Sequence, residues 1–306
     1  MSVLRLRWFP ACSVLPLVVP ALSSLLLIPL IGCPSTVEPP PPDNRPDTTS
    51  HDFVWRIDTL GDGNSSVLND VFIIDENNIW AVGEIYMRDS PGNWEPDAYN
   101  LVKWNGNSWQ LMKIQFYTFC GQSGTGSYPA KSIFAFSATD IWIGMSGSQV
   151  VRWNGQTQAT PMCTPVSINK LWGESPTSVW AVGNNGGIAH FNGTSWTKLE
   201  SGTTTVINDI WGASDPKTGQ TLVLAAVSDK YHTGDMRILS VSLRGVQDAL
   251  VWTLGRRVTS LWFNDPSGVV YECGSGVREY REGAWNEIAL PSIFSNRIRG
   301  SDTNNV

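Results

Sequence analysis

Few residues of this 306-residue sequence have the types and spacing that chemistry requires. The three histidines, His51, His190 and His232, lie far apart, and none has a second ligand at metal-site spacing. Residues 121–126 are rich in glycine, but the lysine and helix of a phosphate-binding loop do not follow. We therefore predict no metal, no cofactor and no catalytic set. We expect a non-catalytic protein, although the sequence leaves an enzymatic role open.

Cys33 is the cysteine with the clearest chemical context. An apolar stretch broken by prolines follows Arg5 and Arg7 and ends in Leu30-Ile31-Gly32-Cys33. This ending resembles the bacterial lipobox, which implies that Cys33 is lipidated and that residues 1–32 are a lipoprotein signal peptide. The alternative is a plain transmembrane anchor, which the prolines disfavour. A lipid would hold the chain on a membrane without spanning it.

Residues 33–52 differ in composition from the rest of the chain. Pro39 to Pro42 are consecutive, and the segment has almost no apolar side chain to bury. Such segments form extended, semi-rigid spacers. We predict a Pro-rich tether between the anchor and a body at 53–306. The protein would then be exported and anchored to the cell envelope, on the periplasmic face or the cell surface.

The element that must position any site is a repeat, clearest at 168–196. Four short runs rich in Trp, Val and Ile are separated by turn residues, and each is too short for an amphipathic helix. Asn192-Gly193 joins the third and fourth runs and predicts a type I′ hairpin. A four-run unit that recurs about every 40 residues is typical of a β-propeller.

Five complete copies fall at about 68–112, 131–160, 167–200, 206–254 and 257–290. A sixth begins at Asn296, and 53–61 matches a fourth run that stands alone. We predict an all-β protein, a β-propeller of about six four-stranded blades with the last blade incomplete. The two middle runs of that blade are absent, so we expect the sequence to be truncated after Val306.

Composition agrees with this fold class. The chain has 15 Trp and 28 Gly, and only 16% of its residues are charged, which favours an all-β repeat over a helical or disordered chain. The formal net charge is −6. An acidic chain with scattered basic residues is a poor partner for nucleic acid.

The repeat also resembles a known group of propellers. Trp-Asn-Gly, a second Trp and a run such as Ser178-Val179-Trp180-Ala181-Val182-Gly183 are similar to the Trp/Gly-rich propeller repeats of bacterial exported proteins. These include photosystem II assembly factor-like and two-component-regulator-like propellers. The resemblance covers about 53–306 and implies the architecture, but it implies no single function.

The first run of each unit would line the central channel of a propeller. Polar residues open these runs, so we expect them at the channel mouth, either as strand caps or as contacts to a small polar ligand or a partner loop. The candidates are Asn69, Asp70, Asn169, Lys170, Asn208, Asp209, Asn296 and Arg297.

Two long insertions, 86–100 and 117–130, carry further candidates. Their aromatic residues Tyr86, Trp94, Tyr117 and Tyr128 could contact a protein or a sugar, or could pack on their own blade. Cys120 and Cys163 follow fourth runs in successive units, and an exported location permits a disulfide between them.

We therefore expect a lipid-anchored extracytoplasmic propeller that acts as a protein-binding or scaffold module. The alternative is a carbohydrate-binding or carbohydrate-active propeller. The turn at 192–196 is similar to the Asp box of sialidase-type propellers but lacks its aspartate. The partner is an unidentified envelope protein or glycan.

Overall fold

Short runs of β-branched and aromatic residues form strands throughout the part of the chain that the computed structural model describes. The described residues are 56–62, 65–229, 235–249, 256–266, 268–288, 296–300 and 306, and they belong to a unit that spans 47–306. The predicted signal peptide, Cys33 and the tether lie outside the described residues, as do His51 and His232.

Five four-stranded antiparallel sheets make up the fold, and each follows the order of the chain from strand to strand. We call them blades 1 to 5. Blade 1 contains β1 (Val67–Asp75), β2 (Asn78–Ile85), β3 (Tyr99–Trp104) and β4 (Trp109–Met112). Blade 2 contains β7 (Ala130–Ser137), β8 (Asp140–Met145), β9 (Gln149–Trp153) and β10 (Met162–Cys163). Blade 3 contains β11 (Lys170–Ser175), β12 (Ser178–Val182), β13 (Ile188–Phe191) and β14 (Trp196–Leu199). Blade 4 contains β15 (Ile207–Ser214), β16 (Thr221–Val227), β17 (Arg237–Ser242) and β18 (Gly245–Asp248). Blade 5 contains β19 (Val258–Trp262), β20 (Val270–Gly274), β21 (Val277–Arg281) and β22 (Ala284–Ile288).

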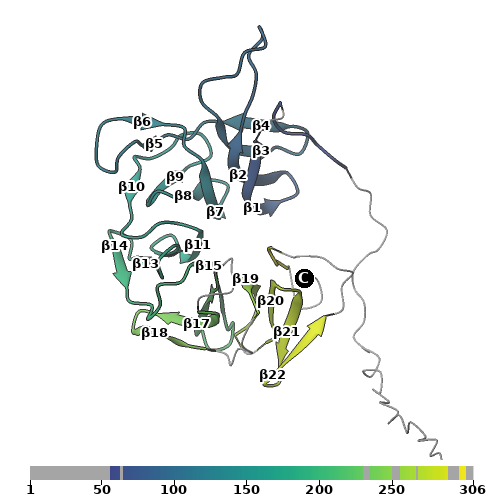
Figure 1. Ribbon diagram of the computed structural model, residues 1–306, viewed down its shortest axis with the longest axis vertical. Helices are drawn as coiled ribbons and strands as arrows, with labels where there is room; N and C mark the ends of the chain where they lie inside the picture. Colours follow the sequence, from purple (N-terminus) through teal and green to yellow (C-terminus); the bar gives the residue numbers. More distant parts are fainter. Residues whose placement is uncertain are drawn as a thin grey trace, which may run out of the picture. The chain divides into compact units, whose positions relative to one another are not determined.

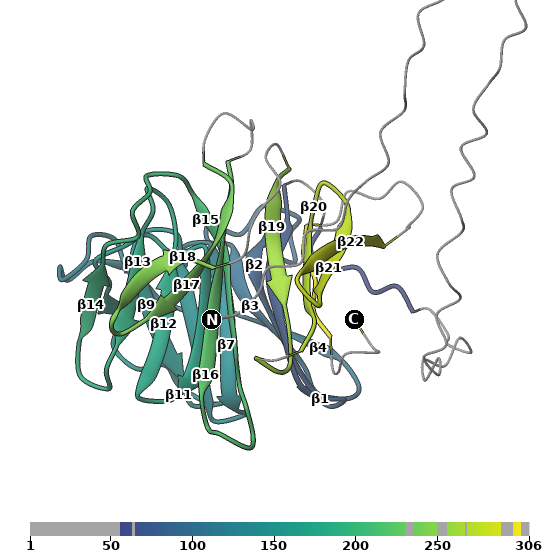
Figure 2. The ribbon, with the colours of Figure 1, turned by 90° about the horizontal axis from the view of Figure 1, so that it is seen from below.

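The first strand of each blade is its inner strand. Contacts between inner strands run in chain order, from β1 to β7, β11, β15 and β19. Figure 1 shows these strands around a common axis with the later strands of each blade outside them. Figure 2, turned by 90°, shows β19 running along that axis. Four-stranded meanders arranged in this way are the blades of a β-propeller, as the repeat predicts.

The blade number differs from the prediction. The described residues form five blades rather than about six. Residues 296–300, expected to begin a sixth blade, lie next to blade 5 without forming a strand. The physical reason is the hydrogen-bonding pattern of a meander, because an inner strand is defined by its ladder with a second strand. No second strand follows this segment within the described ranges.

The core lies mainly between blades. Ile133 and Ala135 on the inner strand of blade 2 pack in one cluster with Trp80 and Val82, which lie on the second strand of blade 1. All four side chains are buried. The same pairing of an inner strand with the preceding second strand recurs around the axis, in contacts of β11 with β8, β15 with β12 and β19 with β16.

The Asn-Gly turns are real, but the predicted type I′ geometry is wrong. Gly193 has a φ of +95°, whereas Asn192 is outside the left-handed region. The Asn192 side chain instead accepts hydrogen bonds from the backbone N–H groups of Thr194 and Ser195, both at 3.0 Å. An Asx turn of this kind caps the turn without positive φ at the asparagine. Asn105 and Asn154 act in the same way.

Candidate binding site in the central channel

The asparagines predicted at the channel mouth act as links between successive blades. In blades 1, 3 and 4 the side-chain amide donates to a backbone oxygen at the start of the next inner strand. These bonds are Asn69 to Ala130 O at 2.9 Å, Asn169 to Ile207 O at 3.1 Å and Asn208 to Val258 O at 3.5 Å. These bonds therefore tie each inner strand to the next, a role that the sequence did not predict.

The charged residues of these pairs take part in two buried relays of hydrogen bonds and ion pairs, and the first of them crosses three blades. In the first relay, Asp70 accepts hydrogen bonds from the Ser132 hydroxyl at 3.0 Å and the Ile133 N–H at 2.9 Å. Ser132 in turn accepts from the N–H of Leu171 at 2.9 Å. The Lys170 ammonium closes the relay on Asp70 Oδ2. One carboxylate thus joins blades 1, 2 and 3.

The second relay repeats this arrangement three blades later. Asp209 accepts from the Ser260 hydroxyl and from the Leu261 N–H at 3.1 Å. Ser260 accepts from the Ile298 N–H at 3.3 Å. The Arg299 guanidinium donates to both oxygens of Asp209, at 3.0 and 2.9 Å. Residues 296–300 therefore occupy the place in the second relay that blade 3 occupies in the first.

Burial and charge set the pKa values of these groups. Burial opposes ionisation of Asp209, but Arg299 and Arg297 outweigh it and lower the pKa of that carboxyl to about 2. The pKa of Asp70 is also below its ordinary value, because Lys170 and Arg297 overcome the effect of burial. Burial lowers the pKa of Lys170 to about 8, against the opposing attraction of Asp70. Both carboxylates are therefore ionised at neutral pH.

The two relays leave an excess of positive charge. Asp70 and Asp209 are the two carboxylates, and Lys170, Arg297 and Arg299 are the three cations. The relays also act on one another, since Arg297 lowers the pKa of Asp70 and Arg299 lowers that of Lys170. A ligand that enters this part of the channel meets fixed cations that are already partly satisfied.

A cavity of about 570 Å³ lies beside the relays. Lys170 and Arg299 form its polar part, and Phe72, Phe134 and Trp211 form aromatic walls. The Phe72 and Phe134 rings meet edge to face, with centroids 5.1 Å apart. The cavity therefore combines an apolar surface with cationic groups, which suits part of a peptide better than a small polar ion.

One side of this cavity belongs to β1 and is open. Val71 and Ile73 line the cavity, and they are 53% and 65% exposed. Exposed branched aliphatic residues on the inner strand of a propeller are unusual, because that strand is normally buried between blades. Contiguous exposed apolar surface next to a cavity is typical of an interaction site.

The aromatic loop candidates lie away from the channel. Trp94 is 40% exposed, and the guanidinium of Arg88 lies 4.1 Å from the centre of its ring. Tyr86 donates a hydrogen bond to Glu84, and Tyr128 donates to the Thr118 hydroxyl at 2.9 Å. These rings are partly packed on their own insertions, so the structure does not gather them into one surface with the channel residues.

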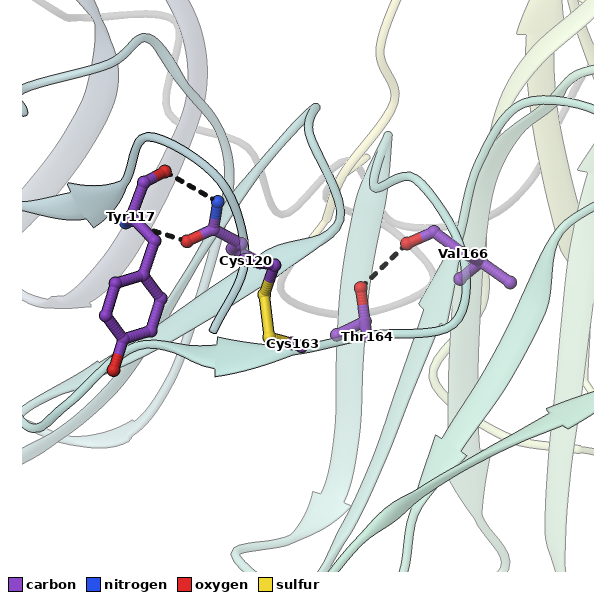
Figure 3. The surroundings of a disulfide bond; sticks show 6 residues. Tyr117, Cys120, Cys163, Thr164 and Val166 are labelled. Carbon is purple, nitrogen blue, oxygen red and sulfur yellow. Dashed lines mark hydrogen bonds between the residues drawn. A yellow bond between two sulfur atoms is a disulfide. The ribbon is translucent and has the colours of Figure 1, made fainter. Parts of the chain in front are cut away.

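Cys120 and Cys163 form a disulfide between the blade 1–blade 2 connection and β10, with their Cα atoms 5.8 Å apart (Figure 3). Tyr117, on β5 (Phe116–Tyr117), lies close by, and the buried Gln149 side chain pairs with its backbone. Gln149 accepts from the Tyr117 N–H at 2.9 Å and donates to its carbonyl at 2.9 Å. Strand β5 pairs with β6 (Thr125–Gly126), so the connection that carries Tyr117 and Tyr128 is held firmly.

His190 is the histidine that lies within the described ranges, and its contacts are those of a packed core residue. His190 is buried, and its ring lies 4.3 Å from that of Trp180. Its Nε2 shares a hydrogen bond with the Ser178 hydroxyl at 2.9 Å. Among the described residues, no group of three or more His, Cys, Asp or Glu side chains could hold a metal ion. These residues also contain no helix long and apolar enough to span a membrane.

Sequence reasoning missed three parts of this site: the relays through Ser132 and Ser260, the role of Arg299, and the exposure of Val71 and Ile73. Ser132 and Ser260 were visible as the central members of a period of three, because the second residues of the opening pairs read Asp, Ser, Lys, Asp, Ser, Arg along the chain. Arg299 gave no signal, since it takes the position of an aromatic residue in other copies. The exposure of Val71 and Ile73 was equally hidden, since their types match those of buried equivalents.

The fold defines the chain as a β-propeller. No family model matches it, and no curated protein matches its sequence. The similar solved structures include YCF48 bound to D1 peptide, with 16% identity, a TM-score of 0.48, and coverage of 75% of this chain and 68% of that one. They also include the WD40 β-propeller domain of Doa1, with 14% identity, a TM-score of 0.44, and coverage of 79% and 89%.

Proposed function

We propose that this chain is a non-catalytic protein-binding or scaffold propeller that works at the cell envelope. The observation that carries the proposal is the open apolar side of the channel cavity at Val71 and Ile73. A cavity that joins exposed aliphatic surface, aromatic walls and fixed cations offers both burial and charge to a protein segment. No described residue outside the relays adds a nucleophile or base to that cavity.

The location belongs to the same proposal. Leu30-Ile31-Gly32-Cys33 supports an exported lipoprotein anchored through Cys33, and the prolines after it support a spacer. The Cys120–Cys163 disulfide fits an oxidising compartment outside the cytoplasm. Fractionation of cells that express the full chain tests this, and Cys33→Ser should move the protein from the membrane to the soluble fraction. Unchanged membrane association would refute the lipid anchor.

A pull-down from the solubilised envelope fraction tests the binding function. Full-length wild type should retain a partner in near-stoichiometric amount, and Ile73→Asp should lose most of it. Leu243→Asp is the matched control, because Leu243 is 72% exposed and lies in the β17–β18 turn, outside the cavity. If wild type retains no partner above background, the proposed function fails.

A further inference from the structure

One row of paired side chains crosses every blade, and its chemistry changes at blade 4. In blades 1 to 3 the second strand supplies a tryptophan, and a basic residue lies directly opposite it on the third strand. The pairs are Trp80 with Lys103, Trp142 with Arg152 and Trp180 with His190. The pair at the same register in blade 4 is Leu224 with Ser240. Blade 4 therefore lacks both the indole ring and the base.

The boundary of blades 2 and 3 shows how such a pair is packed. The Arg152 guanidinium lies 4.9 Å from the centre of the Trp142 ring, as in a cation–π contact. From blade 3, the rings of Phe191 and Trp196 meet the Trp142 ring edge to face, at 5.3 and 6.4 Å between centroids. The indole is thus held between a cation of its own blade and two aromatic rings of the next blade.

The boundary of blades 4 and 5 retains only half of this arrangement. Tyr280 and Trp285 lie opposite one another with ring centroids 5.1 Å apart, at the register of the aromatic pair of blade 3. They pack in one cluster with Leu224. A cavity of about 480 Å³ lies between the two blades, and Leu224, Ser240 and Tyr280 line it. The cavity therefore lies where blades 1 to 3 place a tryptophan and a base.

The charges around this cavity have one sign. Its apolar walls include Leu222 and Val270, and its charged residues are Asp248 and Glu282, with no Lys, Arg or His among the described residues that line it. Asp248 accepts a hydrogen bond from Arg237 at 2.9 Å, so its charge is already compensated. Glu282 is exposed in the β21–β22 turn. An apolar cavity of this size with a carboxylate beside it suits an aromatic group that carries a positive charge.

We propose that the cavity between blades 4 and 5 binds an aromatic amine, with its ring against Leu224 and Tyr280 and its ammonium group toward Glu282. The ligand then supplies from outside the ring and the cation that blades 1 to 3 supply from their own side chains. The cavity shares no lining residue with the channel cavity, so this inference goes beyond the proposed function and does not rest on it.

Calorimetric titration of the full chain with three indole compounds tests the ligand class. Tryptamine, which carries an ammonium group, should bind one to one with a Kd below about 1 mM. Indole should bind about tenfold more weakly, and the anion indole-3-acetate should not bind. A blocked Trp-Lys dipeptide separates the two sources of this chemistry. Tighter binding than tryptamine assigns the site to side chains of a peptide, and weaker binding assigns it to a free amine.

Two variants test the position of the site. Leu224→Trp places in blade 4 the residue of blades 1 to 3 and should abolish tryptamine binding. Glu282→Gln changes an exposed residue and should weaken tryptamine binding about tenfold, with indole binding unchanged. Glu200→Gln is the matched control, because the Glu200 side chain is 92% exposed and lies outside the cavity, and it should bind both compounds as wild type does.

The thermal unfolding midpoint of each variant shows whether it is folded. If Leu224→Trp lowers the midpoint, the exposed Glu282→Gln variant decides the test. The inference is overturned if wild type does not bind tryptamine, or if indole-3-acetate binds as tightly. Tryptamine binding that persists in folded Leu224→Trp, or that Glu282→Gln leaves unchanged, also overturns it.

Discussion

The two faces of blade 1 differ in how far they are buried. The face toward blade 2 is closed by the interlocked side chains of β2 and β7, by the Gln149 contact and by the Cys120–Cys163 disulfide. Among the described residues, 56–62 cover the outer part of the other face, while Val71 and Ile73 on its inner strand are exposed. Both faces have apolar residues of the same types. The difference shows that burial here is decided by the presence of a neighbouring strand, not by local sequence.

Removing the disulfide should have the largest effect on the closed face. The bond joins residues 43 positions apart. Without it the unfolded chain gains conformational entropy, which stabilises the unfolded state by about 4 kcal/mol for a loop of this length. Cys120→Ala with Cys163→Ala should lower the free energy of unfolding by about that amount, measured by denaturant titration. A change below about 1 kcal/mol would mean that the closed face does not depend on its covalent link.

The sharpest comparison comes from the same truncation on each face. Ile133→Ala leaves a cavity in a fully buried cluster and should cost about 3 kcal/mol. Ile73→Ala removes mostly exposed surface and should change stability by no more than about 0.5 kcal/mol. Denaturant titration of both variants measures the difference. Equal losses would show that the second face is covered in solution.

Gln149→Ala tests the polar part of the closed face. It leaves the N–H and carbonyl of Tyr117 without their side-chain partner and should cost about 2 kcal/mol. Gln110→Ala is the matched control, since Gln110 is exposed on β4, and its loss should be within about 0.5 kcal/mol. Hydrogen exchange at the Tyr117 amide should rise only in the first variant.

Acid should loosen the flank of the open face that Asp209 holds. The pKa of Asp209 is about 2 in the folded protein against 3.8 ordinarily, because Arg299 and Arg297 outweigh burial. A depressed pKa stabilises the fold above pH 3.8, and this contribution, about 2 kcal/mol, is lost as the pH falls toward 2. Unfolding measured at pH 5 and at pH 2.5 should show the loss. Asp209→Asn should remove that part of the pH dependence, and an unchanged slope would contradict the assignment.

The sequence predicted the four-stranded repeat and the position of all five blades. Trp142 and Trp180 on successive second strands are 38 residues apart, and Trp172 and Trp211 on successive inner strands are 39 apart, so the period can be read directly. It also placed Asp70, Lys170 and Asp209 at the channel. It did not predict their relays, because a residue in one blade reaches a residue two blades away. The open face escaped for a related reason. Val71 and Ile73 have the residue types of a core, and their exposure depends on which segments pack beside them.

The relays have a consequence for assembly. Blades are similar apolar sheets, and on hydrophobic grounds they could stack in almost any order. Asp70 pairs with Lys170, which lies two blades further along the ring, so this ion pair forms only when the blades pack in their native order. A skipped or exchanged blade would leave a buried charge without its partner, and this would lower the free energy of unfolding by several kcal/mol. Asp70 and Asp209 thus favour the native order of blades, because a different order is electrostatically unfavourable even where its apolar packing is good.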